Sequence, residues 1–177
     1  MIKKILIGII GLIASLLVVA IFVPKDYTVE RQITINKPVT EIFDYIKYLK
    51  NQDEYSKWAS MDPNMKKTYS GTDATPGFVS AWESDVKDVG QGEQKILSIV
   101  PDKQINYDLH FIKPFEGRAE AIMKTQDNGN STTTVKWSIA SSMPYPTNLM
   151  RLFMNIEEMI GNDLDTGLKN LKGKFDK

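Results

Sequence analysis

The chain contains no cysteine and only one histidine among its 177 residues. The lack of cysteine excludes disulfides, thiolate metal sites, a cysteine nucleophile and a lipid-modified N-terminal cysteine. With one histidine, any serine-type triad would depend wholly on His110. Net charge is also absent, because 22 basic residues balance 22 acidic ones, and this balance argues against nucleic acid as a partner.

The longest uncharged stretch runs from Ile5 to Val23 and follows two lysines. As a helix it would span about 28 Å, close to the roughly 30 Å hydrocarbon core of a bilayer. The preceding positive charges predict a cytoplasmic N-terminus, with the rest of the chain on the non-cytoplasmic side. A cleaved signal peptide is the alternative, but the run is longer than usual and no small-x-small site precedes Pro24. We therefore predict a single-pass membrane anchor and joint in residues 1–26, and a domain in residues 27–177 whose core draws nothing from the anchor.

Beyond the anchor, short segments alternate between apolar and polar residues, as the strands of a half-buried sheet do. A first strand is expected at 28–35, followed by a helix entered at Pro38 and a second short helical segment at 53–58. Further strands are expected at 66–70, 78–83, 91–100, 103–112, 116–126 and 132–140, each bounded by turn residues. This order predicts an α+β fold with one antiparallel sheet of about seven strands.

The stretch from Thr147 to Lys172 carries apolar residues in steps of three and four. This spacing predicts one long amphipathic helix, with Gly173 at its C-terminal cap. Gly167 falls near the middle of the apolar face and Asp163 toward its edge, an unusual pair in a helix meant only for packing. We therefore expect this helix to lie across a curved sheet with space between the two.

Several short pieces of sequence resemble the helix-grip fold of the START-like and pollen-allergen-like superfamily (SRPBCC). They resemble in particular its bacterial polyketide cyclase/dehydrase and lipid-transport proteins. The pieces include Ile35-Asn36-Lys37-Pro38, Gly90-Gln91-Gly92, Lys113-Pro114-Phe115-Glu116-Gly117 and Thr133-Thr134-Val135-Lys136-Trp137. The resemblance covers residues 27–172 and implies a curved sheet wrapped around the C-terminal helix, with an apolar ligand cavity between them. It implies no catalytic residue, since the family shares no single catalytic motif that carries onto this sequence.

Large side chains on the faces predicted to point inward are candidates for the cavity wall. The candidate ligand-binding residues are Trp82, Tyr107, Phe111, Met123, Trp137, Phe153 and Ile156, together with Gly167. Plain core packing is the alternative for each of them. Small residues interleaved with them, such as Ala119 and Ala121, favour a cavity because they supply less volume than a filled core needs.

The titratable residues near the predicted cavity do not form a convergent catalytic set. Asp163 is either a carboxylate facing the cavity with a raised pKa or a rim residue in water, and we favour the rim. His110 is predicted to point away from the apolar face of its strand. Gly90-Gln91-Gly92 lacks the helix and lysine of a phosphate loop and is interpreted as a turn or a bulge. We expect no metal and no cofactor.

Three classes of function fit these features. The first, which we favour, is a membrane-anchored module that binds an apolar or lipid-like small molecule. The second is an enzyme of the cyclase/dehydratase type, in which Asp163 or a tyrosine moves protons on a bound apolar substrate. The third is a protein-interaction domain with a filled core. The sequence names neither the ligand nor a protein partner.

Overall fold

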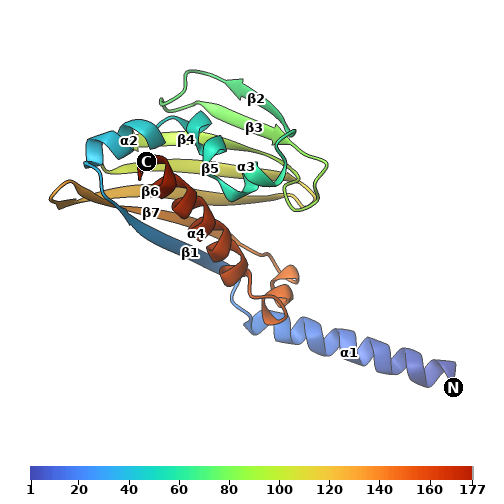
Figure 1. The fold of residues 1–177 in the computed structure, drawn as a ribbon. Coiled ribbons are helices and arrows are strands. Elements are labelled where there is room, and N and C mark those ends of the chain that lie inside the picture. Colours follow the sequence, from blue (N-terminus) through green and yellow to red (C-terminus); the bar gives the residue numbers. More distant parts are fainter. Residues whose placement is uncertain (177) are drawn as a thin grey trace.

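The computed structural model describes residues 1–176, in which a long N-terminal helix leads into a sheet partly covered by helices (Figure 1). In chain order the elements are α1 (Ile2–Phe22), β1 (Asp26–Ile35), α2 (Val39–Ile46), η1 (Leu49–Glu54), α3 (Lys57–Met61), β2 (Lys66–Ser70), β3 (Val79–Glu83), β4 (Gln91–Val100), β5 (Gln104–Lys113), β6 (Gly117–Gly129), β7 (Thr132–Ser142), η2 (Thr147–Leu152) and α4 (Ile156–Phe175). Here η1 and η2 are 3₁₀ helices.

The seven strands form one antiparallel sheet in the order β1-β7-β6-β5-β4-β3-β2. Strands β2 to β7 pair successively as a meander, and β7 then pairs with β1 from Asp26–Ser142 to Ile35–Thr133. The sheet curves around α4, which packs against β1 and β7 (Figure 1). The predicted α+β helix-grip fold is therefore confirmed, with seven strands.

The core lies between the inner face of the sheet and one side of α4. On β7 the inner face consists of Thr133, Val135, Trp137 and Ile139, all buried, while the residues between them are half-buried. On α4 the matching residues are Leu164, Leu168 and Leu171, each no more than 1% exposed. Burying a leucine completely contributes about 1.5–3 kcal/mol, so this contact holds α4 firmly in place.

The C-terminal helix is shorter at its start than the predicted span of 147–172. The chain first forms η2 and an irregular segment, and α4 begins only after Asn155, whose Oδ1 accepts a hydrogen bond from the Glu158 N–H (3.1 Å). Asn155 Nδ2 also donates to the Glu158 carboxylate (2.7 Å), and this bond between the two side chains steadies the N-terminal cap. At the other end Gly173 does not stop the helix, which continues to Phe175.

The helical segment expected at 53–58 is also displaced. In the structure η1 overlaps only the start of this segment and α3 only its end. The backbone N–H groups of Leu49 and Lys50 donate to the two oxygens of Asp73 (2.8 and 3.1 Å), which lies in the β2–β3 connection. This long-range carboxylate fixes where η1 starts, and such a contact leaves no local signal in the sequence.

Helix α1 projects away from the domain (Figure 1), and Ala20 is its one buried residue. Within residues 1–176 it is the one helix long and apolar enough to cross a membrane. Its length and composition agree with the predicted anchor. A helix that is apolar all round and unpacked within the protein needs apolar surroundings.

Hydrogen bonds join the end of α1 to η2. The fully buried Asn148 donates from Nδ2 to the carbonyls of Ala20 (2.7 Å) and Val23 (2.8 Å), near the helix end where carbonyls lack helical partners. Arg151 Nη1 donates to two carbonyls of the joint that follows (2.7 and 3.0 Å). The segment η2 thus supplies the C-terminal cap of α1. The hydrophobic core cluster of the domain contains no residue of 1–26, and the independent folding of residues 27–177 stays a prediction.

Candidate functional site

A pocket of about 350 Å³ lies between the sheet and the segment formed by η1 and α3. This volume falls within the roughly 300–1,000 Å³ of small-molecule sites. Its apolar lining consists of Tyr27, Leu49, Trp58, Ala59, Met65, Trp82, Val89, Leu109, Phe111, Pro114, Phe115, Ala119, Ala121, Trp137, Ile139 and Ile160. The shape and lining suit an apolar guest.

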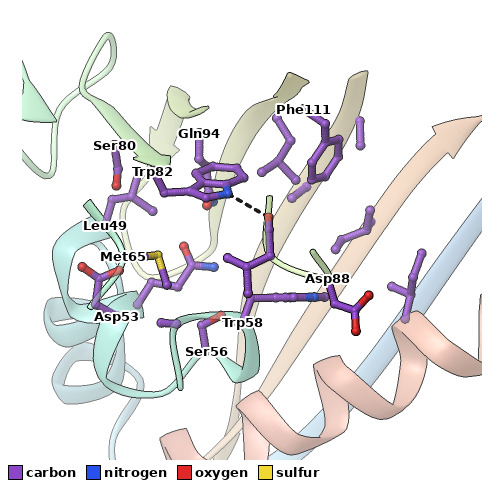
Figure 2. Close-up of a pocket in the computed structure, with 18 of the residues that line it drawn as sticks. Leu49, Asp53, Ser56, Trp58, Met65, Ser80, Trp82, Asp88, Gln94 and Phe111 are labelled. Carbon is purple, nitrogen blue, oxygen red and sulfur yellow. Dashed lines mark hydrogen bonds between the residues drawn. The ribbon is translucent and has the colours of Figure 1, made fainter. Parts of the chain in front are cut away.

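Trp82 on β3 forms part of the wall because a glycine faces it. A Cβ atom on Gly92 would lie 2.6 Å from Trp82 Cζ2, so only glycine at this point of β4 lets the indole lie against the strand. Trp82 Nε1 donates to the Val89 carbonyl (3.2 Å), and the ring meets Phe111 edge-on with centroids 6.3 Å apart (Figure 2). These contacts fix the indole.

Four polar side chains are set among the apolar ones. Gln52, Ser56, Ser80 and Gln94 line the pocket and are at most 9% exposed. Among the described residues, Gln94 Nε2 and the indole Nε1 of Trp137 are buried donors without a hydrogen-bond partner. A buried donor left unpaired costs about 1–3 kcal/mol. Both nitrogens are themselves covered, so an oxygen atom of a guest or of water reaches them only if the side chains shift.

The charged group at the η1 side of the pocket already has partners. Asp53 pairs with Lys67 of β2 and accepts a hydrogen bond from the Tyr69 hydroxyl (2.9 Å). Burial, together with the bond to Asp53, raises the pKa of Tyr69 to about 12, so this hydroxyl stays protonated as a donor. A neutral polar group on a guest fits this side better than a second charge.

The most exposed lining residues gather at one end of the sheet. Asp88 belongs to the β3–β4 turn, Lys113 ends β5, and Pro114 and Phe115 belong to the β5–β6 turn, with Phe115 81% exposed. The strand registers place both turns at the end where β1 starts and β7 ends. We call these two turns, 84–90 and 114–116, the pocket rim. The rim therefore lies at the end of the sheet from which α1 departs (Figure 1).

Three of the eight predicted ligand-binding residues line the pocket, namely Trp82, Phe111 and Trp137. Tyr107 and Met123 face inward as predicted but are buried in the core outside the pocket lining. Their ligand-binding role has no geometric support. For the three lining residues this role stays a prediction.

The remaining three lie near or on α4, away from the pocket lining. Phe153 is 77% exposed and Ile156 is half-buried, because the chain leaves the helical path before α4 begins. Gly167 is buried, and a Cβ atom there would lie 2.8 Å from Trp137 Cζ3. Gly167 thus accommodates the indole and does not border a cavity, contrary to the expectation.

The sequence reading missed the η1–α3 side of the pocket and its polar residues. Two of these carried a visible signal, since Ser80 and Gln94 interrupt the inward-facing positions of β3 and β4. A polar residue on a buried strand face is the informative exception in an alternating pattern. Gln52, Ser56 and Trp58 carried no such signal, because their side of the pocket depends on where η1 and α3 settle.

Of the residues considered for proton transfer, Asp163, His110 and the buried Tyr55 and Tyr107 lie outside the pocket lining, whereas Tyr27 is part of it. Asp163 is half-buried, and desolvation raises the pKa of its carboxyl group while the charge of Lys57 opposes that rise. Burial raises the pKa of Tyr55 and of Tyr107 far above the usual range, which makes both hydroxyls poor proton donors. His110 lies on the outer face, near Glu93 (3.7 Å) and Glu116 (3.5 Å). Residues 1–176 contain no group of three or more histidine or acidic side chains suited to a metal ion.

Comparison with known proteins gives one family and one fold. A family model described as polyketide cyclase/dehydrase and lipid transport matches residues 26–176. No curated protein matches the chain. Similar solved structures include XoxI from Bacillus cereus (14% identity, TM-score 0.61, covering 85% of this chain and 96% of that one). A protein from Nitrosospira multiformis is similar as well (16% identity, TM-score 0.59, covering 84% of this chain and 96% of that one). So is Ara h 8.0201 (14% identity, TM-score 0.57, covering 85% of this chain and 97% of that one). At these identities the likeness shows the fold alone.

Proposed function

Because the chain belongs to the polyketide cyclase/dehydrase and lipid-transport family, we propose that residues 27–177 bind a small apolar molecule that carries a neutral polar group. The observation that carries this proposal is the pocket of about 350 Å³. Its aromatic and aliphatic lining suits the apolar body of such a guest. The polar side chains Gln52, Ser56, Ser80 and Gln94 in the lining suit its polar group.

The enzyme alternative would need a proton-transfer group facing the guest. Asp163, the carboxylate first considered for this chemistry, is outside the pocket lining, and so are the buried Tyr55 and Tyr107. Of the titratable groups that do line the pocket, Asp53 is already paired with Lys67 and Tyr69, while Tyr27, Asp88 and Lys113 come from separate segments. A general acid or base must come within hydrogen-bond reach of its substrate. Binding is therefore the better supported function.

Filling the pocket tests the binding proposal. Ala121 on β6 is 1% exposed and lines the pocket, so Ala121→Leu would place a larger side chain in the space of the guest. We expect the affinity for an apolar fluorescent probe to fall by about tenfold or more, equivalent to at least about 1.4 kcal/mol. Fluorescence titration of the full-length protein in detergent measures this change.

The matched control is Ala140→Leu, which adds the same side chain on the outer face of β7. It should leave probe affinity unchanged. Equal affinity of both variants and the native protein would count against a guest in this pocket.

We also propose that α1 is an uncleaved anchor that holds the domain on the non-cytoplasmic side. Its length and composition support this, together with the two lysines that precede its apolar stretch. The protein should then resist extraction from membranes by alkaline carbonate. A tag placed after Lys177 should be accessible only from outside the cytoplasmic membrane. Recovery of a soluble form that starts near Tyr27 would instead indicate a signal peptide.

A further inference from the structure

A run of exposed apolar side chains lies next to the residues that hold α1. Met150, Leu152, Phe153 and Met154 are exposed by 43, 55, 77 and 39%, and we call them the η2 patch. Phe22 in the last turn of α1 is 81% exposed. Soluble proteins rarely leave a contiguous apolar surface of this kind uncovered, so the patch calls for an apolar partner.

The hydrogen bonds of η2 determine which side chains face outward. Asn148 is turned inward onto the carbonyls of α1, and Arg151 is turned inward onto those of the joint. Arg151 also bonds the Glu157 carboxylate through Nη2 (2.5 Å), and its guanidinium lies 5.6 Å from the centre of the Tyr27 ring. Because the side chains of Asn148 and Arg151 form these hydrogen bonds within the protein, the apolar side chains of this segment face outward.

The η2 patch is held beside the end of α1, where the orange turns between β7 and α4 meet the blue helix (Figure 1). This end of α1 is the one at which the chain leaves the apolar stretch and enters the joint. Lys25 of the joint is exposed, as a residue at the level of lipid headgroups would be. The apolar surface of α1 thus continues onto η2 at the depth where a bilayer ends.

We infer that the η2 patch inserts into the leaflet that surrounds the C-terminal end of α1 and so holds the pocket rim toward the membrane. This inference rests on the anchoring proposed above. Apolar side chains of interfacial segments sink about 5–10 Å into the boundary between headgroups and acyl chains. Phe115 of the rim, 81% exposed, belongs to the end of the sheet nearest α1 and reaches the same boundary.

This arrangement determines the path by which an apolar molecule enters or leaves the pocket. With the rim at the bilayer surface, an apolar molecule passes between the leaflet and the pocket without crossing open water. The partner of the η2 patch is accordingly the lipid surface itself, and not a second protein.

Single-cysteine labelling tests the inference without interference, because the chain has no cysteine of its own. An environment-sensitive fluorophore is attached to the variants Met154→Cys, Phe115→Cys and Gln126→Cys of the full-length protein in phosphatidylcholine vesicles. Gln126 is the control, since it is an exposed residue toward the opposite end of the sheet. Phosphatidylcholine spin-labelled near the headgroup should quench the first two labels roughly threefold more strongly than the control, as for side chains seated at the interface.

A fourth variant separates failure of the inference from failure of the anchoring. Gly11 lies within α1 with open space around it, so a label on Gly11→Cys reports whether the helix is in the bilayer. If this label is quenched by a deep acyl-chain spin label while the Met154 label is quenched only by aqueous iodide, the inference is overturned and the anchoring stands. If the Gly11 label is also quenched only by iodide, both fail.

Discussion

Replacing Trp137 by alanine should lower the free energy of unfolding by about 3 to 5 kcal/mol. The indole is 1% exposed and lies at the centre of an aromatic cluster. It meets Tyr55 edge-on with centroids 5.9 Å apart and Trp58 with centroids 6.2 Å apart. Alanine would leave a void beside the rings of Tyr55, which follows η1, and Trp58 of α3. Urea unfolding of the full-length protein in detergent, followed by near-ultraviolet circular dichroism, measures the loss.

A second variant, Trp137→Phe, separates the contribution of the aromatic ring from that of the indole N–H. It keeps an aromatic ring in the cluster and removes the buried Nε1 donor, which has no partner among the described residues. We expect a loss of only about 1–2 kcal/mol, since the smaller void is partly offset by relief of the unpaired group. A loss below about 1 kcal/mol for Trp137→Ala would place the indole outside the core.

Gly167→Leu should destabilise the protein by about 1 to 3 kcal/mol, although leucine is the better helix former. The reason is the distance of 2.8 Å between a Cβ atom at this position and Trp137 Cζ3. An added side chain must displace either the indole or α4. The same urea unfolding measurement shows whether Gly167→Leu lowers or raises the free energy of unfolding.

Gly173→Ala is the control on the same helix. A Cβ atom at Gly173 meets nothing within 4 Å, so this change should stabilise the protein by up to about 1 kcal/mol through helix propensity. In the double variant Gly167→Leu with Trp137→Phe, the loss of unfolding free energy caused by leucine should be smaller, because phenylalanine lacks the indole atom that the added side chain would contact. Stabilisation by Gly167→Leu alone would indicate that Gly167 borders a cavity, as the sequence led us to expect.

Most strands of this fold could be predicted because the pattern of apolar residues in their own sequence shows which face is buried. On β7 the alternation of Val135, Lys136 and Trp137 is the same in the sequence and in the sheet. The N-terminal helix could be predicted for a similar reason, since its apolarity is continuous along the chain. Both features depend only on neighbouring residues.

The start of α4 and the position of the pocket could not be predicted in this way. Leu152 and Phe153 continue the helical spacing of the residues after them, yet contacts with the end of α1 draw this segment off the helical path. A local signal for the true start existed in the spacing of Asn155 and Glu158, which form the cap. The pocket depends on how η1 and α3 lie over the sheet, and Asp73 from a distant turn positions η1.

The hydrogen-bonded joint has a mechanical consequence for a domain carried by α1 in a bilayer. The 21 residues of α1 extend about 31 Å, so the helix must tilt more in a thinner membrane than in a thicker one. A flexible linker would absorb that tilt, but Asn148 and Arg151 tie the helix end to the domain. If α1 spans a bilayer as proposed, the helix and the sheet tilt together, and the thickness of the membrane sets the angle between the pocket and the membrane surface.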